Sequence, residues 1–103
     1  MTYSLLTYRT LSGYGFLLEE WLMESRVAVI SIVVENFSSV EKLNAILHEY
    51  GSYIIGRMGI PYHKRNISIM SVALDAPADV INTISGRLGM LEGVNAKTIY
   101  SKL

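Results

Sequence analysis

The chain has 103 residues, enough for one domain, and its nine basic and nine acidic residues give a formal net charge of zero. A neutral chain has no basic field to hold a phosphate backbone, which argues against direct binding of nucleic acid. The absence of cysteine excludes disulfides, thiolate metal sites and thiol catalysis, and it agrees with a cytoplasmic location. No apolar run approaches the roughly 20 residues that a membrane span needs.

Half of the residues are hydrophobic, which is a high fraction for a small domain. A domain of this size buries only about two-thirds of the surface that its unfolded chain exposes. Since so much apolar material cannot all be hidden within one copy, the composition favours self-association.

Residues 1–25 mix Tyr, Leu, Thr and Gly without a sustained period, so we treat them as an N-terminal extension of a domain that spans residues 26–103. Part of the extension has apolar residues at helical spacing, which predicts a short helix packed on a neighbour or on a partner subunit. This stripe consists of Phe16, Leu17, Leu18, Trp21 and Leu22.

A different interpretation is that residues 1–22 are translated upstream sequence. Glu19 and Glu20 require purine-rich codons a few nucleotides ahead of the Met23 codon, which is the layout of a bacterial ribosome-binding site. Met23 then leads directly into the first strand, so on this interpretation the true start lies near Met23.

Residues 26–35 are almost continuously Val, Ile and Ala, which predicts a strand that is buried on both faces. Ser38 and Glu41 have the spacing of a capping box, so a helix is expected to start at Ser38 and to stop at Gly51. Its buried stripe consists of Val40, Leu43, Ile46 and Leu47.

A second strand is expected over residues 52–62, where Gly56, Gly59 and Pro61 suit an edge position with a bulge. A polar turn at residues 63–65 leads into residues 66–75, a strand that is again apolar on both faces. Pro77 suits the first position of a second helix, which Arg87 and Gly89 end. Residues 93–101 form a more polar final strand.

The order β-α-β-β-α-β predicts an α+β, ferredoxin-like fold, in which both helices lie on one face of a four-stranded antiparallel sheet. The first and third strands then lie at the centre of the sheet. Because the helices can cover only one face of these strands, the other face is expected to seal a homo-oligomer, a dimer or a tetramer. The expected interface residues are Val27, Val29, Val33, Ile67, Ile69 and Ala73.

Three segments carry a resemblance to a known family. They read RVAVISIVVEN (26–36), SVEKLNAILHEYGSYIIGRMGIPY (39–62) and SIMSVALDAPADVINTISGRLGMLEGVNAKTIYSK (68–102). In these segments the chain resembles the small ACT-like proteins described as regulators of an iron-only ([FeFe]) hydrogenase system. The resemblance implies an ACT-like domain with a regulatory role, and the family's proteins begin near Met23.

That family also resembles the C-terminal regulatory domain of the nickel-responsive repressor, which assembles as a tetramer through such sheets. The repressor holds nickel with a His-x-His strand and a cysteine, whereas this chain has Ser68, Ile69 and Met70 in that strand and lacks cysteine. Residues 1–25 are too short and too weakly basic to supply the repressor's DNA-binding domain. Neither metal sensing nor DNA binding is therefore expected, and no cofactor is predicted.

Two segments are candidate ligand sites. In ACT-type domains effectors lodge between subunits near the first strand–helix loop, which here consists of Glu35, Asn36, Phe37 and Ser38 but lacks the glycine of amino-acid-binding versions. The second candidate is Gly56, Arg57, Met58 and Gly59, where the glycines would let a ligand approach the backbone and Arg57 would grip a carboxylate or phosphate. The alternative is that the glycines form a bulge and that Arg57 is solvated or pairs across a subunit boundary.

The sequence offers little else for chemistry. His48 and His63 are the only imidazoles, and two histidines alone make a poor metal site. Asp75 and Asp79 are explained by the start of the second helix, and Ser31 and Ser71 lack a supporting His–Asp pair. We therefore expect a non-enzymatic oligomeric module that acts through a small effector or a partner protein. The alternative is a small oligomeric ferredoxin-like enzyme or enzyme subunit that uses the sheet face as a pocket.

Overall fold

The computed structural model describes residues 24–102. Its elements follow the order β1 (Ser25–Val34), α3 (Val40–Glu49), β2 (Ile54–Tyr62), β3 (Ile67–Pro77), α4 (Ala78–Gly89) and β4 (Val94–Tyr100). Single 3-10 turns lie at Phe37–Ser39, Gly51–Tyr53 and His63–Arg65. The helical stripe expected within residues 16–22 and the proposed start at Met23 lie outside the described residues.

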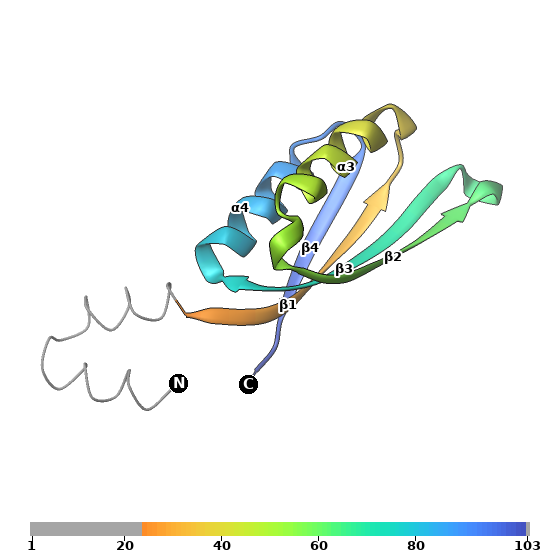
Figure 1. Ribbon diagram of the computed structural model, residues 1–103. Coiled ribbons are helices and arrows are strands. Elements are labelled where there is room, and N and C mark those ends of the chain that lie inside the picture. The colour runs from red at the N-terminus through yellow and green to blue at the C-terminus, as the bar shows by residue number, and fades with distance from the viewer. Residues whose placement is uncertain (1–23, 103) are drawn as a thin grey trace, which may run out of the picture.

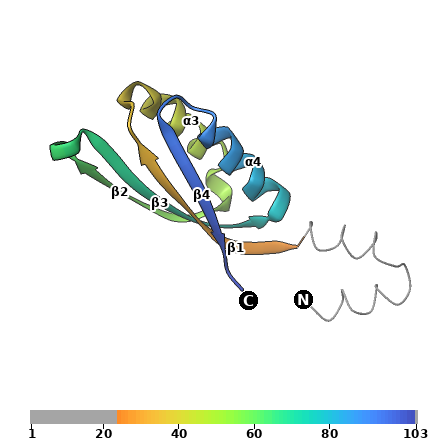
Figure 2. The same ribbon diagram turned by 180° about the vertical axis from the view of Figure 1, so that it is seen from behind.

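The four strands form one antiparallel sheet in the order β2-β3-β1-β4. Both helices pack on the same side of this sheet, as the two opposite views show (Figures 1 and 2). The predicted α+β fold with a βαββαβ order is therefore confirmed, and so is the central position of β1 and β3.

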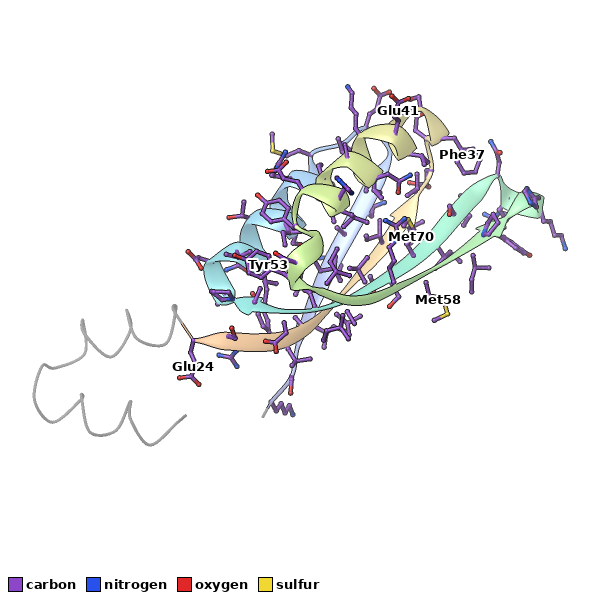
Figure 3. All side chains as sticks on the ribbon, in the orientation of Figure 1. Glu24, Phe37, Glu41, Tyr53, Met58 and Met70 are labelled. Atoms are coloured by element: carbon purple, nitrogen blue, oxygen red, sulfur yellow. The ribbon has the colours of Figure 1, made fainter. Side chains whose placement is uncertain are left out.

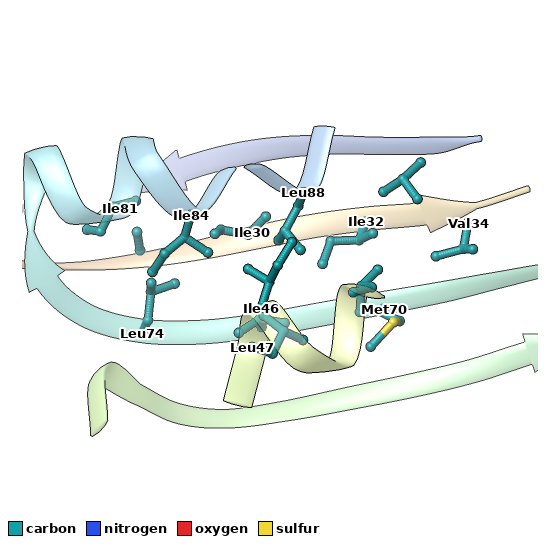
Figure 4. Close-up of a cluster of buried hydrophobic side chains, with 14 of the residues drawn as sticks. Ile30, Ile32, Val34, Ile46, Leu47, Met70, Leu74, Ile81, Ile84 and Leu88 are labelled. Atoms are coloured by element: carbon teal, nitrogen blue, oxygen red, sulfur yellow. The ribbon is translucent and has the colours of Figure 1, made fainter. Parts of the chain in front are cut away.

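The core lies between the sheet and the two helices. Along β1 and β3 the even-numbered residues point toward the helices, and Ile30, Ile32, Val72 and Leu74 are fully buried there. The helices contribute Leu43, Ile46, Leu47, Ile81, Ile84 and Leu88 (Figure 4). Each fully buried aliphatic side chain of this kind contributes about 1.5–3 kcal/mol relative to an exposed one. This one-sided burial is what holds the helices on the sheet.

The β2–β3 hairpin has the irregularities that its sequence predicts. The pairing register shifts between Ile54 and Gly56, which places a bulge at Ile55. At the other end of β2 the turn His63–Arg65 closes on Asn66, which has a left-handed φ of 56°. Asn tolerates this conformation better than most residues with a side chain do.

The second helix begins one residue later than expected. Pro77 is the N-cap of α4 rather than its first helical residue, because it still pairs with Ser25 across the ladder and has an extended ψ of 148°. The carboxylate of Asp79 accepts a hydrogen bond from the Val80 amide at 2.9 Å in the first turn.

Gly93 joins the end of β1 to the turn that precedes β4. Its carbonyl accepts a hydrogen bond of 2.6 Å from the Glu35 amide, and its φ of 69° lies in the left-handed region. A Cβ atom at this position would lie 2.5 Å from the Cβ of Asn36 and 2.9 Å from its backbone nitrogen. Backbone conformation and close packing therefore both require glycine here.

We expect Gly93→Ala to destabilise the domain by about 2–4 kcal/mol, because the left-handed conformation and the overpacking each carry a cost. Urea unfolding followed by circular dichroism at one fixed protein concentration measures the change.

The matched control is Gly86→Ala in α4. A Cβ at Gly86 meets nothing within 4 Å and this glycine does not have a positive φ, so the substitution is expected to stabilise the domain by about 0.5–1 kcal/mol. Equal effects at the two glycines would contradict the role given to Gly93.

Candidate functional site

The face of the sheet that the helices leave uncovered is the main candidate surface, and we call it the open face. It consists of the odd-numbered residues of β1 and β3, of Gly56, Met58, Ile60 and Tyr62 in β2, and of Asn95, Lys97 and Ile99 in β4. All of the expected interface residues in β1 and β3 lie on it, and Val27 and Ile69 are 44% and 45% exposed. Their role in an interface stays a prediction.

The open face is larger than the expected set, because the two outer strands add apolar side chains to it. Met58, Ile60 and Ile99 are 63%, 56% and 66% exposed. Met58 points away from the helices on the uncovered side of the sheet (Figure 3). The alternation of apolar residues at Met58, Ile60 and Tyr62 is the signal for this in the sequence, although Gly59 and Pro61 between them are typical of an irregular strand.

The pairing register sorts the open face into cross-strand rows. One row contains Gly56, Ala73, Val29 and Ile99; the next contains Met58, Ser71, Ser31 and Lys97; the third contains Ile60, Ile69, Val33 and Asn95. The apolar side chains therefore gather over β2, β3 and β1. Of the residues that define this face, the charged ones are Asp75 and Lys97, and both lie toward its margins.

A depression of about 230 Å³ interrupts the open face. It is lined by Gly56, Arg57, Met58, Ser71 and Ala73. Most of the second candidate ligand segment thus lies at one hollow, although Gly59 pairs with Met70, whose side chain is buried on the helix side.

The guanidinium of Arg57 is directed to the other side of the sheet. Arg57 pairs with Val72, whose side chain is buried under the helices, and its Nη2 donates a hydrogen bond of 2.8 Å to Oδ1 of Asn44 in α3. The arrangement therefore anchors Arg57 on a helix rather than holding it over the depression. Binding of an anion by this segment stays a prediction.

The first candidate ligand loop, Glu35–Ser38, is held by its own hydrogen bonds. Oδ1 of Asn36 accepts from the Ser38 amide at 3.0 Å and from the Ser38 hydroxyl at 2.6 Å. The capping box expected between Ser38 and Glu41 is wrong, because the Ser38 hydroxyl is turned back to Asn36. The α-helix starts only at Val40, after a 3-10 turn that Asn36 caps.

The same loop is tied to the α4–β4 turn. The Ser39 hydroxyl donates to the carbonyl of Glu92 at 2.6 Å, and Nδ2 of Asn95 donates to Oε1 of Glu35 at 3.4 Å. Glu35 lies three residues beyond Ile32, which is level with Gly59 through their common partner Met70. The facing ends of the two candidate ligand segments are therefore about 10 Å apart along the strands, and β3 separates β1 from β2 across the sheet. One copy of the chain does not bring them together.

A groove between the two helices was not expected from the sequence. It has a volume of about 540 Å³ and is lined by Lys42, Ala45, Ile46, Glu49, Arg87, Met90 and Leu91. Nη1 of Arg87 donates to Glu49 at 2.9 Å and to the Tyr50 hydroxyl at 3.1 Å. The hydrogen bond to Glu49, followed by that to Tyr50, raises the pKa of Arg87, so this side chain remains a cation. The signal in the sequence was the helical spacing of the α3 residues that line the groove.

Residues 24–102 contain no group of three or more His, Cys, Asp or Glu side chains that could hold a metal ion. His48 lies in the last turn of α3 and His63 in the turn between β2 and β3. In this part of the chain no helix has the length and apolar character to span a bilayer.

Comparison with known proteins identifies the family. The family model that matches residues 26–98 is TM1266-like, described as "Iron-only hydrogenase system regulator, putative". The chain belongs to this family. The resemblance noted from the three sequence segments is therefore confirmed. No curated protein gives a significant match.

Solved structures agree with this assignment. The uncharacterized protein TM1266 from Thermotoga maritima is 32% identical, with a TM-score of 0.74, and the match covers 77% of this chain and 100% of that one. An unknown protein from Galdieria sulphuraria is 16% identical with a TM-score of 0.59, over 78% of this chain and 47% of that one, which shows the fold alone. The divalent ion tolerance protein CutA1 from Ehrlichia chaffeensis is 11% identical with a TM-score of 0.44, over 77% and 84% of the two chains.

The hydrogen bonds of the loop predict unequal effects for two neighbouring substitutions. We expect Asn36→Ala to cost about 1 kcal/mol of stability, since it removes the acceptor for the Ser38 amide. Ser38→Ala removes only an exposed hydroxyl and should cost a few tenths of that amount. Urea unfolding of the two variants beside the unsubstituted chain measures both. A larger loss of stability in Ser38→Ala than in Asn36→Ala would contradict the role given to Asn36 as the cap.

Proposed function

We propose that the chain is a non-enzymatic, oligomeric, ACT-like regulatory module of the cytoplasm, which acts in an iron-only hydrogenase system through a small effector or a partner protein. Membership of a family with that description supports the regulatory assignment. The observation that carries the oligomeric part is the open face, on which large apolar side chains from all four strands are exposed.

The free energy of the open face favours its being covered. Contiguous apolar patches on monomers seldom exceed a few hundred Å². At about 25 cal/mol for each Å² of apolar surface removed from water, covering a patch of about 400 Å² contributes on the order of 10 kcal/mol before the cost of association. A second copy of the same chain carries the same apolar open face and can therefore cover the first.

Regulation would then operate on the assembly. A ligand shifts an equilibrium between two states only by the difference in its affinity for them. An effector held at a boundary between subunits, with Glu35, Asn36, Phe37 and Ser38 on one side, would bind one arrangement of subunits better than another. Contact with DNA would come from a separate protein.

An enzyme or enzyme subunit is the second candidate, and the depression on the open face is the observation in its favour. Its volume of about 230 Å³ is below the roughly 300–1,000 Å³ of ordinary small-molecule pockets. The lining side chains other than Arg57 do not titrate, and Arg57 is anchored to Asn44. These features support the regulatory proposal over the enzymatic one.

We expect the full chain to sediment as a dimer or a larger species at micromolar concentration in analytical ultracentrifugation. Folding is followed on the same samples by circular dichroism. A species that remains monomeric and cooperatively folded across the whole concentration range would contradict the oligomeric module.

A thermal-shift screen with amino acids, nucleotides and divalent metal ions tests the regulatory part. We expect at least one of these classes to raise the Tm, because a ligand that binds only the folded state stabilises it by mass action. Analysis of the same mixtures by mass spectrometry after incubation should show the ligand unchanged. Consumption of the ligand would instead favour the enzyme.

A further inference from the structure

Gly56 lines the depression and directly follows the bulge at Ile55. Its φ is not in the positive range, and a Cβ atom added to it would meet nothing within 4 Å. A glycine inside a strand often marks a bulge, as it does here, or a place where another part of a protein approaches closely. The space above Gly56 is therefore open to something outside the copy that contains it.

Close to the depression the same two strands carry a protrusion, which we call the ridge. Ile60 in β2 and Ile69 in β3 are direct cross-strand partners, and they are 56% and 45% exposed. The ridge lies about three residues along β2 from the middle of the depression, which is about 10 Å. A hollow whose lining includes Gly56, Ser71 and Ala73 and a ridge of two isoleucines thus lie side by side on one surface.

We propose that a second copy of this chain covers the open face, and that the ridge of each copy inserts into the depression of the other. A two-fold axis that lies between the two sheets, parallel to them and across the strands, makes both insertions at once when it passes midway between ridge and depression, as an isologous interface requires. This axis passes over the cross-strand pair Met58 and Ser71, which lines the depression on the side nearer the ridge. The inference rests on the proposed oligomeric function and specifies the contact through which it occurs.

The geometry of packed sheets allows this arrangement. Two aligned sheets pack face to face about 10 Å apart, at an angle of about 30°. Because the ridge lies only about 5 Å from the axis, such an angle moves it sideways by about 2–3 Å, which is less than the width of an isoleucine side chain. Insertion therefore does not require parallel strands.

Area and charge both favour a second copy as the occupant. Strands of about nine residues in a four-stranded sheet present roughly 600 Å² per copy, so a dimer buries roughly 1,200 Å², the lower limit of stable specific interfaces. The ridge residues are uncharged, and the charged residue that lines the depression, Arg57, is hydrogen-bonded to Asn44 on the helix side of the sheet. Asp75 lies near the end of β3, and Lys97 lies on the edge strand β4. A partner for such a surface must itself be uncharged and apolar, with a hollow beside a ridge, and this chain has that surface.

Two substitutions test the contact from its two sides. Gly56→Val fills the depression, and Ile69→Ser removes half of the ridge. Because each change occurs twice in the dimer, we expect the dissociation constant measured by analytical ultracentrifugation to rise at least about a hundredfold in each case. At concentrations where the chain is monomeric, thermal unfolding of Gly56→Val should occur at the same temperature as that of the unsubstituted chain, or at a higher one.

The matched control is Ile99→Ser, which removes an apolar side chain of the same face that is 66% exposed but lies on the far edge strand. We expect it to change the dissociation constant less than about threefold. An effect as large as that of Ile69→Ser would show that the face associates without using the ridge, and would overturn the inference.

The absence of cysteine allows a direct test of the axis. Met58→Cys places one thiol in each copy beside the proposed two-fold axis. Sheets about 10 Å apart are too distant for a disulfide, so a short bismaleimide reagent is used as the probe. We expect a covalent dimer from Met58→Cys at dilute protein concentration and little from Ile99→Cys.

The outcomes separate this inference from the function on which it rests. If the unsubstituted chain stays monomeric at every concentration, the oligomeric function fails and the ridge contact fails with it. If the chain associates but Gly56→Val and Ile69→Ser associate equally well, or Met58→Cys does not cross-link, only the ridge contact fails.

Discussion

The two central strands are apolar on both faces, but the helices cover only one face of the sheet. The other features of the molecule follow from this. A hydrophobic pattern normally sets strand register, because a slip of one residue exchanges the buried and exposed sets. In β1 and β3 such a slip would exchange one apolar set for another. Ser31 and Ser71 resolve this ambiguity, since they are direct partners on the open face and a slip would bury a hydroxyl under the helices.

Contacts at the ends of the strands fix the same pairing register that Ser31 and Ser71 indicate. At the end of β1 the Glu35 amide donates to the carbonyl of Gly93, and Gly93 packs so closely on Asn36 that a Cβ atom would not fit. In the hairpin the bulge at Ile55 and the left-handed Asn66 fix how β2 lies beside β3. These features involve the backbone at strand ends, turns and a bulge, so the apolar side chains on both sides of the sheet remain available for packing.

The parts of the fold that depend on local pattern could be predicted from the sequence, and those that depend on distant contacts could not. The strand order and the helix-free face followed from the apolar runs. The cap of α3 did not, because Ser39 is held by the Glu92 carbonyl, 53 residues away. The side on which Arg57 lies depends on the bulge at Ile55, and its partner Asn44 comes from a helix. The candidate ligand segments were placed correctly on their elements, but their separation along the sheet needed the pairing register.

One contact links the predicted effector loop to the open face. Asn95 belongs to the row that contains the ridge residues Ile60 and Ile69, and its amide donates to the carboxylate of Glu35 at 3.4 Å. This hydrogen bond is long and exposed, so it is easily exchanged for another partner. A cationic or amide-bearing effector that took over the Glu35 carboxylate would release Asn95 at the margin of the face that we propose a second copy covers. If Asn95 contacts the second copy, such a ligand would have different affinities for the free and the associated chain, which is what regulation through assembly requires.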